Sequence, residues 1–193
     1  MHPPRPPHST LPCTFGHPPV VGGDITLKAW TRRLEGSGLP PFFVIDDAQR
    51  LETLAAKLGL DVPVQGIDAP SQAIEVFTTA LPVLHQPLAA PAVFGQPDAA
   101  NAAATIRAIE RAVELVKAHH ASAVVTNPIS KDVLYGAGFK FPGHTEFLAH
   151  LDGPDATPVM MLACAQLRVV LATVHVSLLD AAQTLSRDAI INV

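Results

Sequence analysis

The chain has 193 residues, of which 48% are hydrophobic and 16% charged, and its formal net charge is −4 at pH 7. This composition is typical of a globular α/β core and argues against global disorder. The negative charge and the lack of a basic run exclude nucleic acid as an expected partner. Polar residues interrupt every apolar run, so neither a membrane span nor a signal peptide is expected, and a cytoplasmic protein is predicted.

The first 23 residues differ from the rest of the chain, because they hold seven of the 19 prolines. Proline lacks an amide donor and fixes φ, so neither a helix nor a central strand is predicted here. We interpret residues 1–21 as a disordered or aberrant leader.

From Asp24 onward, helical and extended patterns alternate. Asp24 is predicted to cap a helix that ends at Gly36. A buried strand is predicted at 41–46, followed by an amphipathic helix at 47–60. A short extended piece is predicted in "DVPVQGI" (61–67), and a short strand, broken by prolines, in "ALPVLHQP" (80–87).

The most regular helical pattern covers residues 98–119. Asp98 is its predicted cap, and its apolar face is marked at spacings of three and four by Ile106, Ile109, Val113 and Val116. A buried strand is predicted at 122–128, and a hairpin from "TPVMMLAC" and "LRVVLATVHV" (157–176), within which Cys164 is expected to be buried. The alternation predicts an α/β fold, and the hairpin a mixed sheet.

Polar residues and glycines gather in "VTNPISKDVLYGAGFKFPGHTEF" (125–147). Ligands of open α/β sheets bind beyond the carboxyl ends of strands, and free amides at a helix start favour phosphate. His144 and Thr145 stand at such a predicted start. The alternative is that Thr145 caps the helix and His144 is incidental. Lys131 is interpreted as a solvated loop lysine, and no catalytic acid or base is assigned.

His175 follows the apolar run "LRVVLATV". A catalytic metal site needs roughly three protein ligands, and the residues near His175 do not supply them. From the local sequence alone, His175 is therefore expected to be a structural histidine.

The stretches "VVTNPISKDVLYGAGFKFPGHTEFLA" and "PVMMLA", followed by "LRVVLATVHVSLLD", resemble the 4-hydroxythreonine-4-phosphate dehydrogenase family of vitamin B6 biosynthesis. The resemblance runs from about Gly22 to the last residue. It implies a three-layer α/β/α fold with a mixed, mostly parallel sheet, similar to isocitrate and isopropylmalate dehydrogenases. Residues 22–193 would then be the N-terminal α/β portion of a two-domain enzyme, with the second domain incomplete.

The resemblance also implies a reaction, which is the NAD- or NADP-dependent oxidation and decarboxylation of 4-phosphohydroxy-L-threonine to 3-amino-2-oxopropyl phosphate in pyridoxal phosphate biosynthesis. His144 and Thr145 match the family's substrate-binding pair. His175 matches the first of three histidines that bind a divalent metal, which is Zn, Mg or Co. The family forms a homodimer in which the subunits share the metal site.

The sequence departs from the family at both ends. Family members open with a turn of the form GDPAGIGP, whereas this chain has "GHPPVVGGD" at 16–24, and it ends soon after His175. We therefore expect a truncated chain with an aberrant N-terminus that does not turn over alone. Two alternatives stay open, namely a dehydrogenase of phosphorylated threonate, phosphorylated erythronate or a cis-diol, and a non-catalytic remnant.

Overall fold

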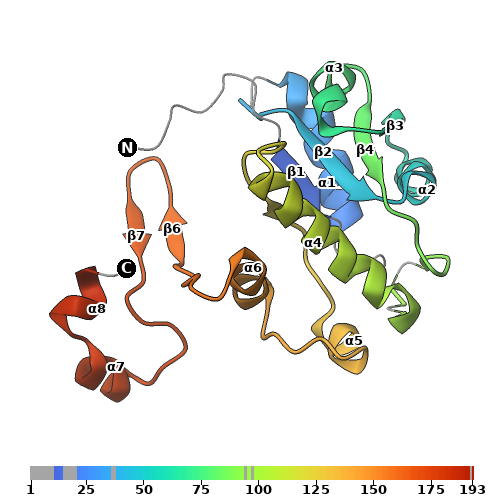
Figure 1. The fold of residues 1–193 in the computed structure, drawn as a ribbon. Coiled ribbons are helices and arrows are strands. Elements are labelled where there is room, and N and C mark those ends of the chain that lie inside the picture. Colours follow the sequence, from blue (N-terminus) through green and yellow to red (C-terminus); the bar gives the residue numbers. More distant parts are fainter. Residues whose placement is uncertain (1–10, 15–20, 36–37, 94, 97, 192) are drawn as a thin grey trace. The chain divides into compact units, whose positions relative to one another are not determined.

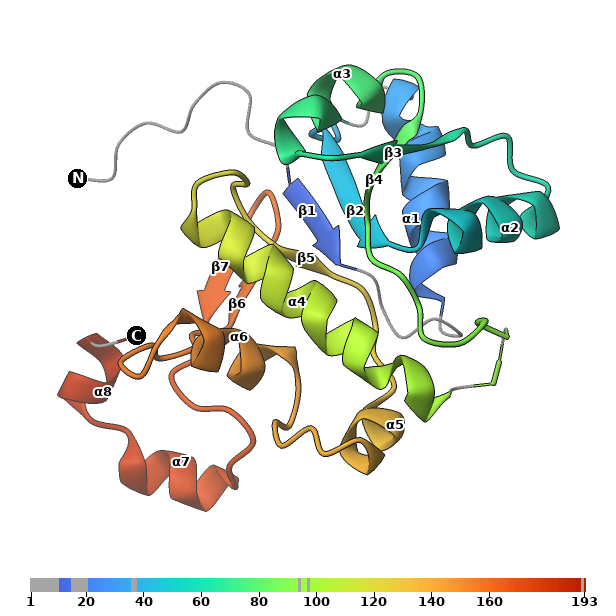
Figure 2. The same ribbon diagram turned by 45° about the vertical axis from the view of Figure 1, so that its right-hand side comes forward.

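The computed structural model describes residues 11–14, 21–35, 38–93, 95–96, 98–191 and 193. The chain divides into two compact units, Met1–His144 and Thr145–Val193, and each unit is considered by itself. Figures 1 and 2 show the chain in two orientations.

A five-stranded parallel sheet organises the first unit, with the strand order β3-β4-β2-β1-β5. Its strands are β1 (Leu11–Thr14), β2 (Phe42–Asp46), β3 (Val64–Ile67), β4 (Leu81–His85) and β5 (Val125–Thr126). The α-helices of this unit are α1 (Gly22–Thr31), α2 (Ala48–Leu58), α3 (Ala73–Phe77), α4 (Ala102–Lys117) and α5 (Lys131–Gly136). Short 3₁₀ turns occupy Arg32–Leu34, Pro70–Gln72 and Ala99–Asn101.

The sheet is covered on both faces, which gives the predicted three layers. Phe42 and Val44 of β2 pack with residues of α1 and α2, whereas Phe43 and Ile45 pack with alanines of α4. Successive side chains of a strand point to opposite faces, so one strand supplies both cores. In Figure 1, α1 and α2 accordingly lie on one side of the sheet and α4 crosses the other.

The prediction that the proline-rich start contains no central strand was wrong for residues 11–14. β1 lies between β2 and β5 and pairs with both of them, with Pro12 opposite Phe43. A proline costs a strand one ladder bond, but tertiary pairing on both sides overrides this local preference. The rest of the predicted leader, apart from Val21, lies outside the described residues.

The first helix begins earlier than predicted. Gly22 and Gly23 are already helical and buried, so Asp24 stands in the first turn and is not the cap. A Cβ atom on Gly23 would lie 2.6 Å from Cδ2 of Leu54, so α1 approaches α2 too closely there for a side chain. The local sequence does not reveal this close approach of the two helices.

Between residues 41 and 87, the predicted strands at 41–46 and 80–87 and the predicted helix at 47–60 are confirmed, and the extended piece at 61–67 contains β3. The helix α3 and the 3₁₀ turn that precedes it were not predicted. Asp47 caps α2 by accepting a bond from the Arg50 amide at 3.0 Å, and Gly59 ends the helix in the left-handed region with φ 66°. The predicted helix at 98–119 is also present, but among its four marked positions only Ile109 is fully buried. The helix packs on the core that holds Phe43 and Ile45 through the buried Ala104, Ala108 and Ala112, and through the partly buried Leu115 and Val116.

Two predictions about buried strands need correction. The strand predicted at 122–128 is reduced to the two-residue β5 at the sheet edge, where Val125 is 46% exposed. The predicted hairpin exists, but it forms a separate two-stranded antiparallel sheet in the second unit, so the five-stranded sheet is parallel throughout. β5 pairs with β1 alone among the described strands, so it lacks a neighbour on its other side, and residues 122–128 pack less deeply than their composition indicates.

The second unit contains α6, which begins at the unit boundary, the hairpin and two short helices. These are α6 (His144–Asp152), β6 (Met161–Ala163), β7 (Arg168–Val170), α7 (Leu178–Thr184) and α8 (Arg187–Ile191). No described residue after Phe147 is buried. Cys164, which was predicted to be buried, is exposed, because the apolar run around it packs against no core.

None of the described helices is both long enough and apolar enough to cross a bilayer.

Asp46, at the carboxyl end of β2, is a buried acid within the first unit. Its Oδ2 lies 2.7 Å from Nη1 of Arg50, and its Oδ1 accepts a bond from the Asp47 amide. Burial raises the pKa of Asp46 to about 7, although Arg50 and the Asp47 amide act in the opposite direction. Desolvation of the carboxylate therefore outweighs its ion pair.

This raised pKa predicts a pH-dependent stability. The folded state holds the Asp46 proton more tightly than the unfolded state does. The stabilisation that this proton gives the folded state is therefore complete below pH 4 and is lost as pH rises through about 7. Between these values the free energy of unfolding should fall by at most about 1.4 kcal/mol per pH unit because of this group. Urea unfolding followed by the fluorescence of Trp30, the single and buried tryptophan, measures the effect.

The variant Asp46→Asn should lack this part of the pH dependence, and Asp61→Asn, at an exposed position, should retain it. Equal pH slopes for wild type and Asp46→Asn would contradict the assignment.

Candidate functional site

The candidate site begins where β5 ends, at Asn127. This side chain is buried, and its Nδ2 donates to Oγ1 of Thr26 in α1 at 3.0 Å. The bond joins the loop after β5 to the first helix across most of the unit's sequence. It therefore fixes the direction in which the chain leaves the carboxyl edge of the sheet.

The turn after α5 has several internal contacts. Gly138 adopts φ 88°, in the region that favours glycine, and the Phe139 amide returns to the Leu134 carbonyl at 2.9 Å. The rings of Phe139 and Phe141 are 5.4 Å apart, and the Tyr135 hydroxyl donates to the Pro142 carbonyl at 3.3 Å. These contacts hold the segment that leads into α6.

His144 is the first residue of α6 and is half-buried. Its Nε2 is buried and has no hydrogen-bond partner among the described residues. Burial lowers the pKa of His144, and the positive charge of Lys131 lowers it further. A neutral imidazole with an unpartnered nitrogen is available to donate to, or accept from, a ligand.

Lys131 is exposed, as predicted, but it is the first residue of α5 and not a loop lysine, and its charge acts on His144. Thr145 follows His144 in α6 and is exposed. Within the described part of the chain, its side chain has no hydrogen-bond partner, so the alternative that Thr145 caps this helix is not seen. The structure thus brings His144 and Thr145 together at one helix start.

His175 belongs to the second unit, between β7 and α7, and is exposed. Its φ is 56°, in the left-handed region, which is uncommon for a residue other than glycine and which His119 also adopts, with φ 60°. Within the described ranges, no three His, Cys, Asp or Glu side chains are grouped to hold a metal ion. The described residues therefore do not build the metal site that the resemblance implies.

Sequence reasoning missed the pair formed by Asn127 and Thr26. The Asn-Pro turn drew attention to Asn127 as part of a polar loop, but nothing in the sequence indicated that its amide is buried. Thr26 gave no signal, because a threonine within a helical pattern has no distinctive spacing.

Comparison with known proteins relates this arrangement to a family. The family described as "Pyridoxal phosphate biosynthetic protein PdxA" matches residues 39–193. A protein named 4-hydroxythreonine-4-phosphate dehydrogenase from Methylorubrum extorquens is 46% identical over 93% of this chain and 53% of its own length. The protein of the same name from Bradyrhizobium diazoefficiens is 45% identical over 94% of this chain and 55% of its own length.

A solved structure agrees with the sequence comparison. The crystal structure of a 4-hydroxythreonine-4-phosphate dehydrogenase from Burkholderia phymatum superposes with a TM-score of 0.86 at 31% identity, covering 95% of this chain and 55% of that one. The chain thus spans about half the length of the curated relatives it matches. Because the family match extends over most of the sequence, the chain belongs to the PdxA family of pyridoxal phosphate biosynthetic proteins.

Proposed function

We propose that the chain serves the NAD- or NADP-dependent oxidation and decarboxylation of 4-phosphohydroxy-L-threonine to 3-amino-2-oxopropyl phosphate, in the biosynthesis of pyridoxal phosphate. The observation that carries the proposal is the 46% identity to a relative named 4-hydroxythreonine-4-phosphate dehydrogenase over 93% of this chain. The unpartnered Nε2 of His144 at a helix start supports it, because such a position suits a phosphorylated ligand.

The proposed reaction has two steps. The substrate alcohol becomes a ketone as its hydride passes to the nicotinamide and its hydroxyl proton is released. The resulting β-keto acid then loses carbon dioxide, and a proton replaces the carboxylate on the same carbon. The proposed role of this chain's residues is to orient the substrate, because holding it in a reactive geometry lowers the activation barrier.

His144 and Thr145 are the proposed substrate-binding residues. A neutral His144 can donate one hydrogen bond to a substrate oxygen without carrying a charge, while the Thr145 hydroxyl and the first amides of α6 offer further donors. Lys131 supplies positive charge near His144, which favours an anionic substrate.

The remaining parts of the proposal concern the whole enzyme. Residues 22–193 form the N-terminal α/β portion of a two-domain dehydrogenase, which acts in the cytoplasm as a homodimer. His175 is one ligand of a divalent metal, Zn, Mg or Co, at a site shared between subunits. The match of His175 to the family's first metal histidine supports this role. The other ligands would come from outside the described residues.

Binding and turnover together test the proposal. Calorimetric titration with 4-phosphohydroxy-L-threonine should detect binding. The chain alone should not reduce NAD with the same substrate and added Zn²⁺ or Mg²⁺, because the described residues do not supply a complete set of metal ligands. His144→Ala should weaken binding about tenfold, because one ligand hydrogen bond to a charged group is lost. His120→Ala, at an exposed histidine after α4, is the matched control and should bind normally.

Tighter binding of a phosphorylated threonate than of the amino acid would favour the alternative substrate. Equal affinities for wild type and His144→Ala would remove His144 from the site.

The influence of Lys131 on His144 gives a separate prediction. Lys131→Met removes the positive charge, so the pKa of His144 should rise while the effect of burial remains. An NMR titration of the His144 ring proton measures this change. Lys140→Met removes a nearby exposed lysine along the chain and should leave the pKa of His144 unchanged. An unchanged value in Lys131→Met would show that burial alone sets this pKa.

A further inference from the structure

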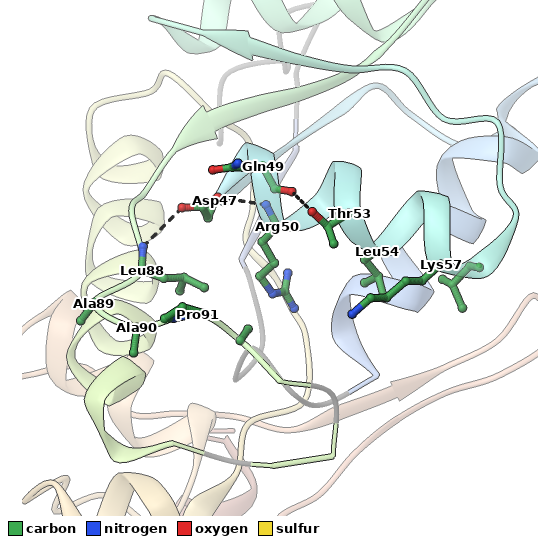
Figure 3. Close-up of a pocket in the computed structure, with 12 residues that line it drawn as sticks. Asp47, Gln49, Arg50, Thr53, Leu54, Lys57, Leu88, Ala89, Ala90 and Pro91 are labelled. Atoms are coloured by element: carbon green, nitrogen blue, oxygen red, sulfur yellow. Dashed lines mark hydrogen bonds between the residues drawn. The ribbon is translucent and has the colours of Figure 1, made fainter.

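A cavity of about 710 Å³ lies in the first unit between α2 and the segment that follows β4. Figure 3 shows side chains of α2 on one side and the chain from Leu88 to Pro91 on the other. This volume falls within the range that small-molecule sites occupy. The lining residues that the structure describes lie between positions 47 and 92, outside the segment that holds His144 and Thr145.

The cavity lies beyond the carboxyl ends of two neighbouring strands, β2 and β4. β2 and β4 are neighbours, but the chain leaves β2 toward α2 on one face and leaves β4 toward α4 on the other. Such a divergence is a topological switch point, where open α/β sheets bind ligands in the crevice beyond the strand ends. The cavity lies at this divergence, since Asp47 follows β2 and Leu88 follows β4.

One wall is a stripe along α2. Arg50, Leu54 and Lys57 are four and three residues apart, so they share one helix face. The Arg50 side chain is 9% exposed, and its Nη1 lies 2.7 Å from Oδ2 of Asp46. Lys57 is exposed and has no ion pair within the described part of the chain, and in Figure 3 it extends from the same side of the helix as Arg50.

The other wall is held by Asn101, which is fully buried. Its Oδ1 accepts bonds from the amides of Ala89 and Ala90 at 3.0 and 3.1 Å, and its Nδ2 donates to the Ala90 carbonyl at 3.0 Å. The Leu88 amide donates to Oδ2 of Asp47 at 3.5 Å, which joins the two walls. These bonds hold the backbone of the second wall in place before any ligand arrives, which lowers the entropic cost of binding.

The described lining is amphipathic, and its cation without an ion pair is Lys57, since Arg50 is already paired with Asp46. Its charged members are the cations Arg50 and Lys57 and the carboxylate of Asp47, and that carboxylate already accepts bonds from the amides of Arg50 and Leu88. Most of the remaining lining is aliphatic, from leucines, alanines and a proline.

We propose that this cavity binds a small organic anion, with its carboxylate or phosphate toward Arg50 and Lys57 and an apolar body against Leu54 and the wall formed by Leu88–Ala92. The site stands apart from the proposed dehydrogenase reaction and does not rest on it. Charge-assisted bonds fix the anionic end, and burial of the apolar body adds the rest of the affinity.

Amide chemical shifts of the labelled chain test the site with four probes. Phenyl phosphate and benzoate combine an anion with an apolar ring, inorganic phosphate is the anion alone, and benzyl alcohol is the ring without the charge. At least one of the two complete probes should shift the amides of α2 and of Leu88–Ala90, more tightly than either partial probe. The tighter of the two identifies the preferred head group.

Three variants complete the test. Lys57→Ala should weaken binding of the tighter probe about tenfold, because a charge-assisted contact is lost. Lys28→Ala, which removes an exposed lysine of α1 outside the cavity, should leave it unchanged. Thr53→Trp places a large ring at the lining without altering charge and should abolish binding.

The proposal is overturned if neither complete probe shifts these amides at millimolar concentration. It is also overturned if Lys28→Ala and Lys57→Ala weaken binding equally, or if inorganic phosphate binds as tightly as phenyl phosphate.

Discussion

The fold depends on a single short strand whose two faces are both covered. Every residue of β2 is buried, and its alternating side chains enter two different cores. A strand of this kind cannot stand at an edge or face water, so helices must pack on both sides of the sheet. α1 and α2 cover one face of the sheet, and α4 covers the other. Because the helices are divided in this way, the chain leaves β2 toward one face and β4 toward the other. The placement of loops at the carboxyl edge is therefore a consequence of how β2 is buried.

Elements with a strong pattern of their own could be predicted from sequence. The uninterrupted apolar run of β2, the capped and glycine-terminated α2 and the long α4 each specify their structure locally. β1 could not be predicted from the sequence, because its position between two strands comes from long-range pairing and its own residues include a proline. The prediction that Cys164 is buried was also wrong. An apolar run indicates burial only where other residues of the fold cover it.

The site shows the same division. The position of His144 at a helix start follows from local sequence, and its match to a family of dehydrogenases gives that position a chemical meaning. The unpartnered Nε2 and the effect of Lys131 depend on how the loop after α5 folds back, and no spacing in the sequence shows them. The buried bond between Asn127 and Thr26 belongs to the same class, because its partners lie far apart along the chain.

The hairpin of β6 and β7 has a thermodynamic consequence. Met161 and Leu162 point to opposite faces of their strand, yet they are 55% and 58% exposed, so no described residue of the second unit buries either face of the hairpin. An isolated two-stranded hairpin is marginally stable in water. Folding of the hairpin is then coupled to the binding of any surface that buries its apolar side chains, and the two form one equilibrium. The apparent stability of the hairpin should vary with the concentration of that covering surface, whereas the stability of the parallel sheet should not.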